Sequence, residues 1–206
     1  MKDRKTITVY VEGKKVTNVK EGLTAGDLAP LFGGNHIAPI IAAKINNRIV
    51  QLSEPLIDQC KVDFIDMDSG DGVRIYKRSL QFLLAFAMHK MMPHCKLKIS
   101  HSVSNGVYCT VEGVKADEEL ASKLEAEMKR LVSLELPIEE VIVNKKEAVK
   151  ILEKQGREDS IMVLDYLDED KVTFYKCQDY YDSFFSSIVA NTRYLKVFSI
   201  RYHEDG

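Results

Sequence analysis

Four residues of the types that bind metal ions lie near the middle of the chain: His89, His94, Cys95 and His101. Imidazole nitrogens and thiolates are preferred ligands of zinc. Their spacing matches none of the usual zinc-binding patterns, and Pro93 separates His89 from the other three. We therefore interpret them as ordinary surface and core residues, and we predict no metal site and no cofactor in this segment.

A second group of candidate ligands is acidic and consists of Asp165, Asp168, Glu169 and Asp170. Clustered carboxylates are typical ligands of divalent cations. The same run, from Leu164 to Lys171, also has the composition of an exposed turn between two strands. The turn is the interpretation that the sequence favours.

Aromatic side chains surround the last cysteine, Cys177. They are Tyr175, Tyr180, Tyr181, Phe184 and Phe185. Aromatic rings beside a cleft can stack on a nucleic-acid base or a nucleoside. The alternative is that these rings fill the interior, and that Cys177 is a packed core residue, as lone cysteines usually are.

The stretch from Val73 to Val111 contains no aspartate or glutamate but several cations, namely Arg74, Lys77, Arg78, Lys90, Lys96 and Lys98. Such a stretch predicts a local face that binds anions. The alternative is a helix and a strand whose solvent-exposed edges are basic without a partner. A net charge of −2 excludes a general field for polyanions over the whole chain.

The 206 residues are enough for one large domain or two small ones, with 45% hydrophobic and 29% charged residues. No apolar run approaches the roughly 20 residues that a membrane-spanning helix requires. The N-terminus is polar and does not have the pattern of a signal peptide. Four widely spaced cysteines are typical of reduced thiols. We therefore expect a cytoplasmic protein without a membrane partner.

Hydrophobic periodicity predicts the elements that must hold these residues. In the first part we expect strands at 6–11, 15–19, 40–45, 48–52 and 61–65, and a helix at 24–32 capped by Thr24. The polar, glycine-containing range 67–73 is predicted to be a linker. Beyond it we expect helices at 74–92 and 117–132, a helix that begins after Asn144 and ends at Gly156, and strands at 96–99, 107–111, 141–143, 161–166, 172–176 and 194–202.

The order of these parts resembles two known modules. Residues 1–66 look like a TGS domain, the ubiquitin-like β-grasp module of threonyl-tRNA synthetases and some GTPases. Residues 74–206 resemble the editing domain, or second additional domain, of threonyl- and alanyl-tRNA synthetases. The stretches that carry this second resemblance are 78–85, 97–108, 143–148 and 172–182. The resemblance implies an α+β fold with a TGS β-grasp domain at 1–66, a linker at 67–73 and an editing-like domain with a buried central helix at 74–206.

In that editing family one helix begins His-x-x-x-His, and a later segment carries Cys-x-x-x-His. The matching positions here are Arg78, Phe82, Cys177 and Tyr181, so three of the four expected side chains are absent. A guanidinium cannot bind a cation, phenylalanine has no donor atom, and tyrosine, with a pKa near 10, is a poor general base. We therefore predict no catalytic residue. The candidate is a binding cleft that includes Phe82, with Arg78 as anion contact and Cys177 and Tyr181 on the opposite wall.

The two modules with a degraded histidine set also resemble the front of a bacterial family of uridine-kinase-like nucleoside kinases. This implies a non-catalytic accessory region that binds RNA or a nucleotide, ahead of an ATP-binding kinase domain. No Gly-x-x-x-x-Gly-Lys-Ser/Thr motif occurs here, so we expect the kinase domain to follow in a longer parent chain. The alternative is an aminoacyl-tRNA editing hydrolase with altered site residues, and a third possibility is a structural or oligomerising module.

Overall fold

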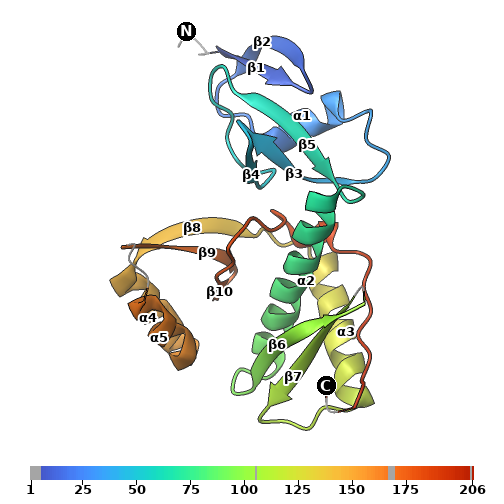
Figure 1. Cartoon of the computed structure of the whole chain (residues 1–206), viewed down its shortest axis with the longest axis vertical. Helices are drawn as coiled ribbons and strands as arrows, with labels where there is room; N and C mark the ends of the chain where they lie inside the picture. The colour runs from blue at the N-terminus through green and yellow to red at the C-terminus, as the bar shows by residue number, and fades with distance from the viewer. Residues whose placement is uncertain (1–5, 105, 167–169, 205) are drawn as a thin grey trace. The chain divides into compact units, whose positions relative to one another are not determined.

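The computed structural model describes residues 6–104, 106–166, 170–204 and 206. The described part is α+β, with five α-helices, one short 3-10 helix and ten strands in three sheets (Figure 1). The chain divides into two compact units. The first contains Met1–Ser79 and Phe185–Ala190, and the second contains Leu80–Phe184 and Asn191–Gly206.

The first unit is built on a five-stranded sheet. Its strands are β1 (Thr6–Val11), β2 (Lys14–Lys20), β3 (Ile40–Ile45), β4 (Arg48–Val50) and β5 (Lys61–Asp66), in the order β2-β1-β5-β3-β4. β1 pairs parallel to β5, and the other neighbours are antiparallel. The five strands predicted for this part are confirmed. In β1 burial alternates, and Val9 and Val11 are fully buried.

Helix α1 (Ala25–Phe32) begins where the sequence predicts it. The Thr24 hydroxyl accepts the Asp27 backbone N–H at 3.3 Å, and the Asp27 carboxylate accepts the Thr24 N–H at 2.8 Å. This capping box satisfies two of the backbone donors that a helix start leaves free. The helix ends at Gly33, which is also as predicted.

Helix α2 (Gly70–Met91) begins four residues earlier than the expected start at Arg74. The Ser69 hydroxyl accepts the Gly72 N–H at 3.0 Å, which caps the helix within the range read as a linker. Gly72 permits a close approach of two chain segments, because a Cβ there would lie 1.8 Å from the Asp66 carbonyl oxygen. Here the glycine serves close packing, whereas the sequence suggested a flexible connection.

A late segment of the chain, 185–190, packs within the first unit. The Ser79 hydroxyl accepts the Val189 N–H at 3.0 Å, and the Gln51 amide donates to the Val189 carbonyl at 3.1 Å. Both side chains are buried, so these bonds fix a segment more than a hundred residues away in sequence.

The second unit contains most of the remaining elements. β6 (Lys96–Val103) and β7 (Gly106–Glu112) form an antiparallel pair. α3 (Glu118–Ser133) buries the stripe predicted for it, namely Leu120, Leu124, Met128 and Leu131. Asp117 caps α3 by accepting the Leu120 N–H at 2.9 Å. The turn predicted between β6 and β7 falls partly on Asn105, which lies outside the described residues.

A second antiparallel sheet in this unit has the order β10-β9-β8. Its strands are β8 (Glu139–Asn144), β9 (Lys171–Cys177) and β10 (Tyr180–Asp182). Helices α4 (Lys145–Lys154) and α5 (Glu158–Asp165) contribute to a core with Val172 and Phe174 of β9. Asn144 caps α4 as expected, and Gly156 follows it with φ of +66°.

The strand predicted at 161–166 is wrong, because α5 occupies this range. Ile161 and Leu164 pack against the core, while Met162 and Val163 are mostly exposed. A spacing of three residues between core contacts is typical of a helix.

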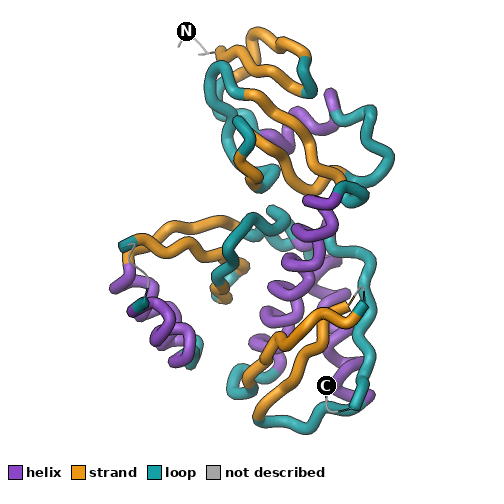
Figure 2. Tube along the Cα trace, in the orientation of Figure 1, coloured by secondary structure: helices purple, strands orange, loops and turns teal. Residues whose placement is uncertain are grey.

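The strand predicted at 194–202 is also wrong. A 3-10 turn, η1 (Thr192–Tyr194), precedes residues without regular structure, and Figure 2 shows this stretch as loop. The Ile200 N–H donates to the Glu125 carboxylate of α3 at 2.7 Å instead of to a neighbouring strand. Among the described residues, no helix combines the length and hydrophobicity needed to cross a membrane.

Candidate functional site

Phe82, at one of the positions where the editing family has histidine, is fully buried in the second unit. Its ring centroid lies 5.5 Å from that of Tyr180, 6.4 Å from that of Phe86 and 6.3 Å from that of Phe184. Tyr175 packs against Phe184 at 6.4 Å. We call these five residues, Phe82, Phe86, Tyr175, Tyr180 and Phe184, the aromatic cluster. Such ring pairs stabilise a fold beyond the area that they bury.

Cys177 ends β9, where it pairs with Tyr180 of β10. Directly paired residues point to the same face of a sheet, so the thiol lies on the face that carries Tyr180. Cys177 is fully buried, and this burial raises the pKa of its thiol to about 12. At neutral pH the group is therefore a neutral thiol, which is a poor nucleophile and a poor metal ligand.

Tyr180 of the aromatic cluster also belongs to a hydrogen-bonded chain of three residues with Asp182 and Arg157. The Tyr180 hydroxyl donates to Asp182 Oδ2 at 3.1 Å, and Arg157 Nη1 donates to Asp182 Oδ1 at 2.6 Å. Burial raises the pKa of the Tyr180 hydroxyl well above its usual value, and the Asp182 charge acts in the same direction. The hydroxyl is thus a fixed hydrogen-bond donor at neutral pH.

Tyr181 lies on the opposite face of the β9–β10 pair, since successive strand residues alternate. Its ring packs edge-on against Phe174 at 6.2 Å, and the Lys176 ammonium lies 5.7 Å from its centroid. Gln155 accepts from the Tyr181 N–H at 2.7 Å and donates to its carbonyl at 2.9 Å. The structure therefore brings Phe82 and Tyr180 together and turns Tyr181 toward a different core.

Arg78 belongs to the first unit. Its guanidinium donates to the Ser187 carbonyl at 2.8 Å, so part of its hydrogen-bonding capacity holds the segment 185–190. The role of Arg78 as an anion contact stays a prediction, as does the cleft in which it was placed with Phe82, Cys177 and Tyr181.

Two of the three histidines near the middle of the chain pack against tyrosines. His89 lies 5.2 Å from the Tyr180 ring, and His101 lies 5.3 Å from the Tyr108 ring. Over the described ranges, no group of three or more His, Cys, Asp or Glu side chains is placed to hold a metal ion. Two members of the acidic run, Asp168 and Glu169, lie outside the described residues.

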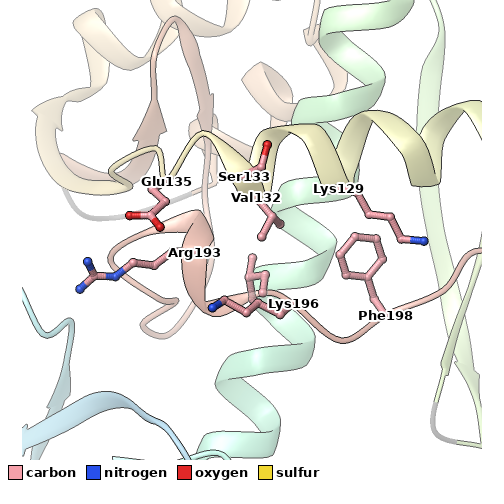
Figure 3. Close-up of a pocket in the computed structure, with 8 residues that line it drawn as sticks. Lys129, Val132, Ser133, Glu135, Arg193, Lys196 and Phe198 are labelled. Atoms are coloured by element: carbon pink, nitrogen blue, oxygen red, sulfur yellow. The ribbon is translucent and has the colours of Figure 1, made fainter.

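A second feature of the second unit is a pocket of about 360 Å³ at the C-terminal end of α3 (Figure 3). We call it the basic pocket, and it is lined by Lys129, Val132, Ser133, Glu135, Arg193, Leu195, Lys196 and Phe198. Figure 3 shows Lys129 and Phe198 at one end of this pocket, and Glu135 and Arg193 at the other. Three of the lining residues are cations and one is a carboxylate.

The charges of the basic pocket differ in how they are held. The Lys129 ammonium lies 2.5 Å from the Glu125 carboxylate. Arg193 donates to the Tyr194 hydroxyl at 3.1 Å and lies over its ring at 5.1 Å. Lys196 is exposed, and within the part of the chain that the structure describes it makes no ion pair or hydrogen bond. A cation without a protein partner remains free to bind an anion.

Reasoning from the sequence did not identify the basic pocket. Lys129 and Val132 fall within the helix predicted at 117–132, and residues 194–198 fall within the strand predicted at 194–202. The lining residues come from two stretches about sixty positions apart, so no local motif could have joined them. Their common sign of charge is the one signal in the sequence.

Comparison with known proteins shows similarity to part of several threonine–tRNA ligases. The chain is 25% identical to a threonine–tRNA ligase of Carboxydothermus hydrogenoformans over 196 residues, which is 94% of this chain and 31% of the relative. It is 31% identical to a threonine–tRNA ligase of Fusobacterium nucleatum over 164 residues, 78% of this chain and 26% of the relative. No protein-family profile matches the chain.

The chain thus spans about a third of the length of the curated relatives that it matches. These relatives favour the synthetase-like interpretation of the sequence over the kinase one, since neither is named as a kinase. The kinase domain and its ATP-binding function stay a prediction. The chain is therefore similar, over most of its length, to part of threonine–tRNA ligases.

Proposed function

We propose that this chain is a threonyl-tRNA-synthetase-like region that binds tRNA without hydrolysing the aminoacyl ester. In this proposal residues 1–66 are a TGS β-grasp domain, 67–73 connect the parts, and 74–206 are an editing-like domain. The similarity to threonine–tRNA ligases over 94% of the chain supports it. So does the five-stranded order β2-β1-β5-β3-β4 with one capped helix, which is compatible with a β-grasp.

The observation that carries the non-hydrolytic part is the aromatic cluster. Ester hydrolysis requires a general base or a metal-bound water beside the carbonyl carbon. At Phe82 the fully buried ring contacts three other aromatic rings, so neither a base nor a metal ligand is present there. A carbonyl group could reach this position only if packed rings moved out of the core.

Cys177 does not restore the lost chemistry. Nucleophilic cysteines have a lowered pKa and are accessible to the substrate. Cys177 has neither property, because it is fully buried and its thiol pKa is raised to about 12. This argues against the alternative of a hydrolase with altered site residues.

Binding to tRNA is supported by the relatives, which are named for a reaction on tRNA, and by the distribution of charge. No acidic residue interrupts 73–111, and Lys96 and Lys98 of β6 are exposed. Cations that neutralise phosphates release counterions, so such binding weakens steeply as the salt concentration rises.

The test is a titration of the full chain with fluorescently labelled threonine-type tRNA, measured by anisotropy at several salt concentrations. An unrelated structured RNA of equal length is the control for charge alone. We expect saturable binding that is tighter for the tRNA and that weakens with salt. Equal binding of both RNAs, or no binding of the tRNA at physiological salt, would overturn the proposal.

A further inference from the structure

We propose that the basic pocket binds a nucleotide, with its phosphate on the cationic side chains and its base against Phe198. This site lies apart from the positions that resemble the editing motif, so the inference goes beyond the proposed function. It rests on the volume, the charges and the apolar lining of the basic pocket.

The charges select an anion. The lining contains three cations, Lys129, Arg193 and Lys196, and one carboxylate, that of Glu135. It therefore carries an excess of positive charge. Lys129 is already paired with Glu125, and Arg193 is held by Tyr194. Lys196 is therefore the lining cation most available to bind an anion, and a phosphate with a charge between −1 and −2 suits it.

The apolar lining selects something larger than phosphate alone. Val132 and Phe198 contribute apolar surface to the basic pocket, with Phe198 beside Lys129 at one end. Leu195, which also lines the pocket, is fully buried, while Phe198 is half-buried. A partly exposed aromatic ring is a surface on which a planar base can stack. Inorganic phosphate would leave this surface unused.

The volume and the single carboxylate narrow the ligand further. A pocket of about 360 Å³ lies at the lower end of the range for small-molecule sites, so it suits one nucleotide unit. Glu135 can accept a hydrogen bond from a ribose hydroxyl or from an amino group of the base. The same carboxylate repels a second phosphate at its end of the pocket.

This chemistry has two possible sources, a free mononucleotide or one nucleotide unit of an RNA strand. Only the RNA source rests on the proposed function, because the proposed contact with tRNA would bring such a strand to the protein. A mononucleotide would bind whether or not the chain interacts with tRNA.

The experiment uses the full chain and measures binding of adenosine 5′-monophosphate, inorganic phosphate and a labelled single-stranded adenine oligoribonucleotide. Lys196→Gln removes the free cation, and Phe198→Leu keeps apolar volume but removes the planar ring. Lys123→Gln is the matched control, since Lys123 is an exposed lysine of α3 that does not line the basic pocket.

We expect the monophosphate to bind more tightly than inorganic phosphate. Lys196→Gln should weaken its binding about tenfold, and Phe198→Leu should weaken it roughly fivefold. The Lys123→Gln variant should stay within about twofold of the wild type. If the oligoribonucleotide shows the same pattern at lower concentration, RNA is the source; if only the monophosphate binds, the free nucleotide is.

The inference is overturned if neither the monophosphate nor the oligoribonucleotide binds, or if inorganic phosphate binds as tightly as the monophosphate. It is also overturned if the Lys196→Gln, Phe198→Leu and Lys123→Gln variants all bind the monophosphate with the same affinity. These outcomes are separate from those for tRNA. Threonine-type tRNA that binds Lys196→Gln and wild type equally would leave the proposed function intact and remove the basic pocket from it. If the monophosphate binds and tRNA does not, the nucleotide site at the basic pocket stands and the proposed function fails.

Discussion

The aromatic cluster and the basic pocket lie in the same unit and differ in burial, in space for a ligand and in charge. The cluster includes Phe82, at a position where the editing family that the chain resembles has histidine, and Phe82 is fully buried among other rings. The basic pocket sits where no motif was noticed, and it combines about 360 Å³ of space with three cations. One is closed and apolar, and the other is open and charged.

This contrast teaches that the position indicated by a family resemblance need not be the position that has space and charge for a ligand. When the ligating histidines of such a site are replaced, the buried space must be refilled, because protein interiors tolerate few voids. Large aromatic rings do this and stabilise the fold.

The largest expected effect concerns chemical access. With a pKa of about 12, only roughly one Cys177 thiol in ten thousand is ionised at pH 8. We expect iodoacetamide to leave Cys177 unmodified in the folded chain and to modify it after unfolding, as measured by mass spectrometry of peptides. Acetylating reagents should modify Lys196 in the folded chain. Rapid alkylation of Cys177 in the folded chain would show that the aromatic cluster is open, and the contrast would fail.

The next effect is on stability. Phe82→Ala should lower the free energy of unfolding by about 3–5 kcal/mol, because it leaves a cavity among packed rings. Phe198→Ala should cost only about 1 kcal/mol, since that ring is half-buried. Denaturant titration followed by circular dichroism measures both. If Phe82→Ala does not fold, Phe82→Leu should still fold with a loss of about 1–1.5 kcal/mol. Equal costs for Phe82→Ala and Phe198→Ala would contradict the difference in burial.

The ion pair between Arg157 and Asp182, next to the aromatic cluster, should contribute more to stability than the pair between Lys129 and Glu125, next to the basic pocket. Asp182→Asn weakens the bond from Arg157, whose side chain is 31% exposed, and should cost about 1–3 kcal/mol. Glu125→Gln weakens the bond from Lys129, which is 60% exposed, and should cost under about 1 kcal/mol. Thermal unfolding of the two variants in parallel tests this order. The reverse order would mean that the ion pair beside the basic pocket is the structural one.

The smallest expected effect on stability is that of removing the charge of Lys196. Lys196→Gln should change the free energy of unfolding by less than about 0.5 kcal/mol, because the side chain is exposed and its charge is unpaired among the described residues. The same variant should lose nucleotide affinity. A clear loss of stability would give Lys196 a structural role and would weaken its assignment to a ligand.

The sequence predicts those parts of the fold that depend on local rules. The caps at Thr24 and Asn144, and the buried stripe of α3, follow from patterns within one or two helical turns. The strand predicted at 161–166 is a helix, because its apolar residues suit either structure and packing against α4 and β9 decides between them. The segment 194–202 fails for a similar reason, since its backbone donor at Ile200 is taken by a side chain of α3.

The candidate site depends even more on contacts between distant residues. The sequence indicates a buried central helix around Phe82 and offers a packed core position for Cys177, and both residues are fully buried. Their partners, however, could not be read from the sequence. The pairing of Cys177 with Tyr180 puts Tyr180 into the aromatic cluster and turns Tyr181 away from it. A shift of one residue along a strand reverses the side-chain direction, so only the register decides which tyrosine it is.

The most direct test of the central claim is the lifetime of the ester bond on bound tRNA. Threonine-type tRNA carrying a labelled amino acid is incubated with saturating full-length chain, and the release of the amino acid is followed over time. We expect the ester to survive at least as long as it does in buffer, because Phe82 and Cys177 are fully buried and neither offers a base or an accessible nucleophile to the ester. Release that is faster than in buffer, and that Cys177→Ala abolishes, would contradict the claim.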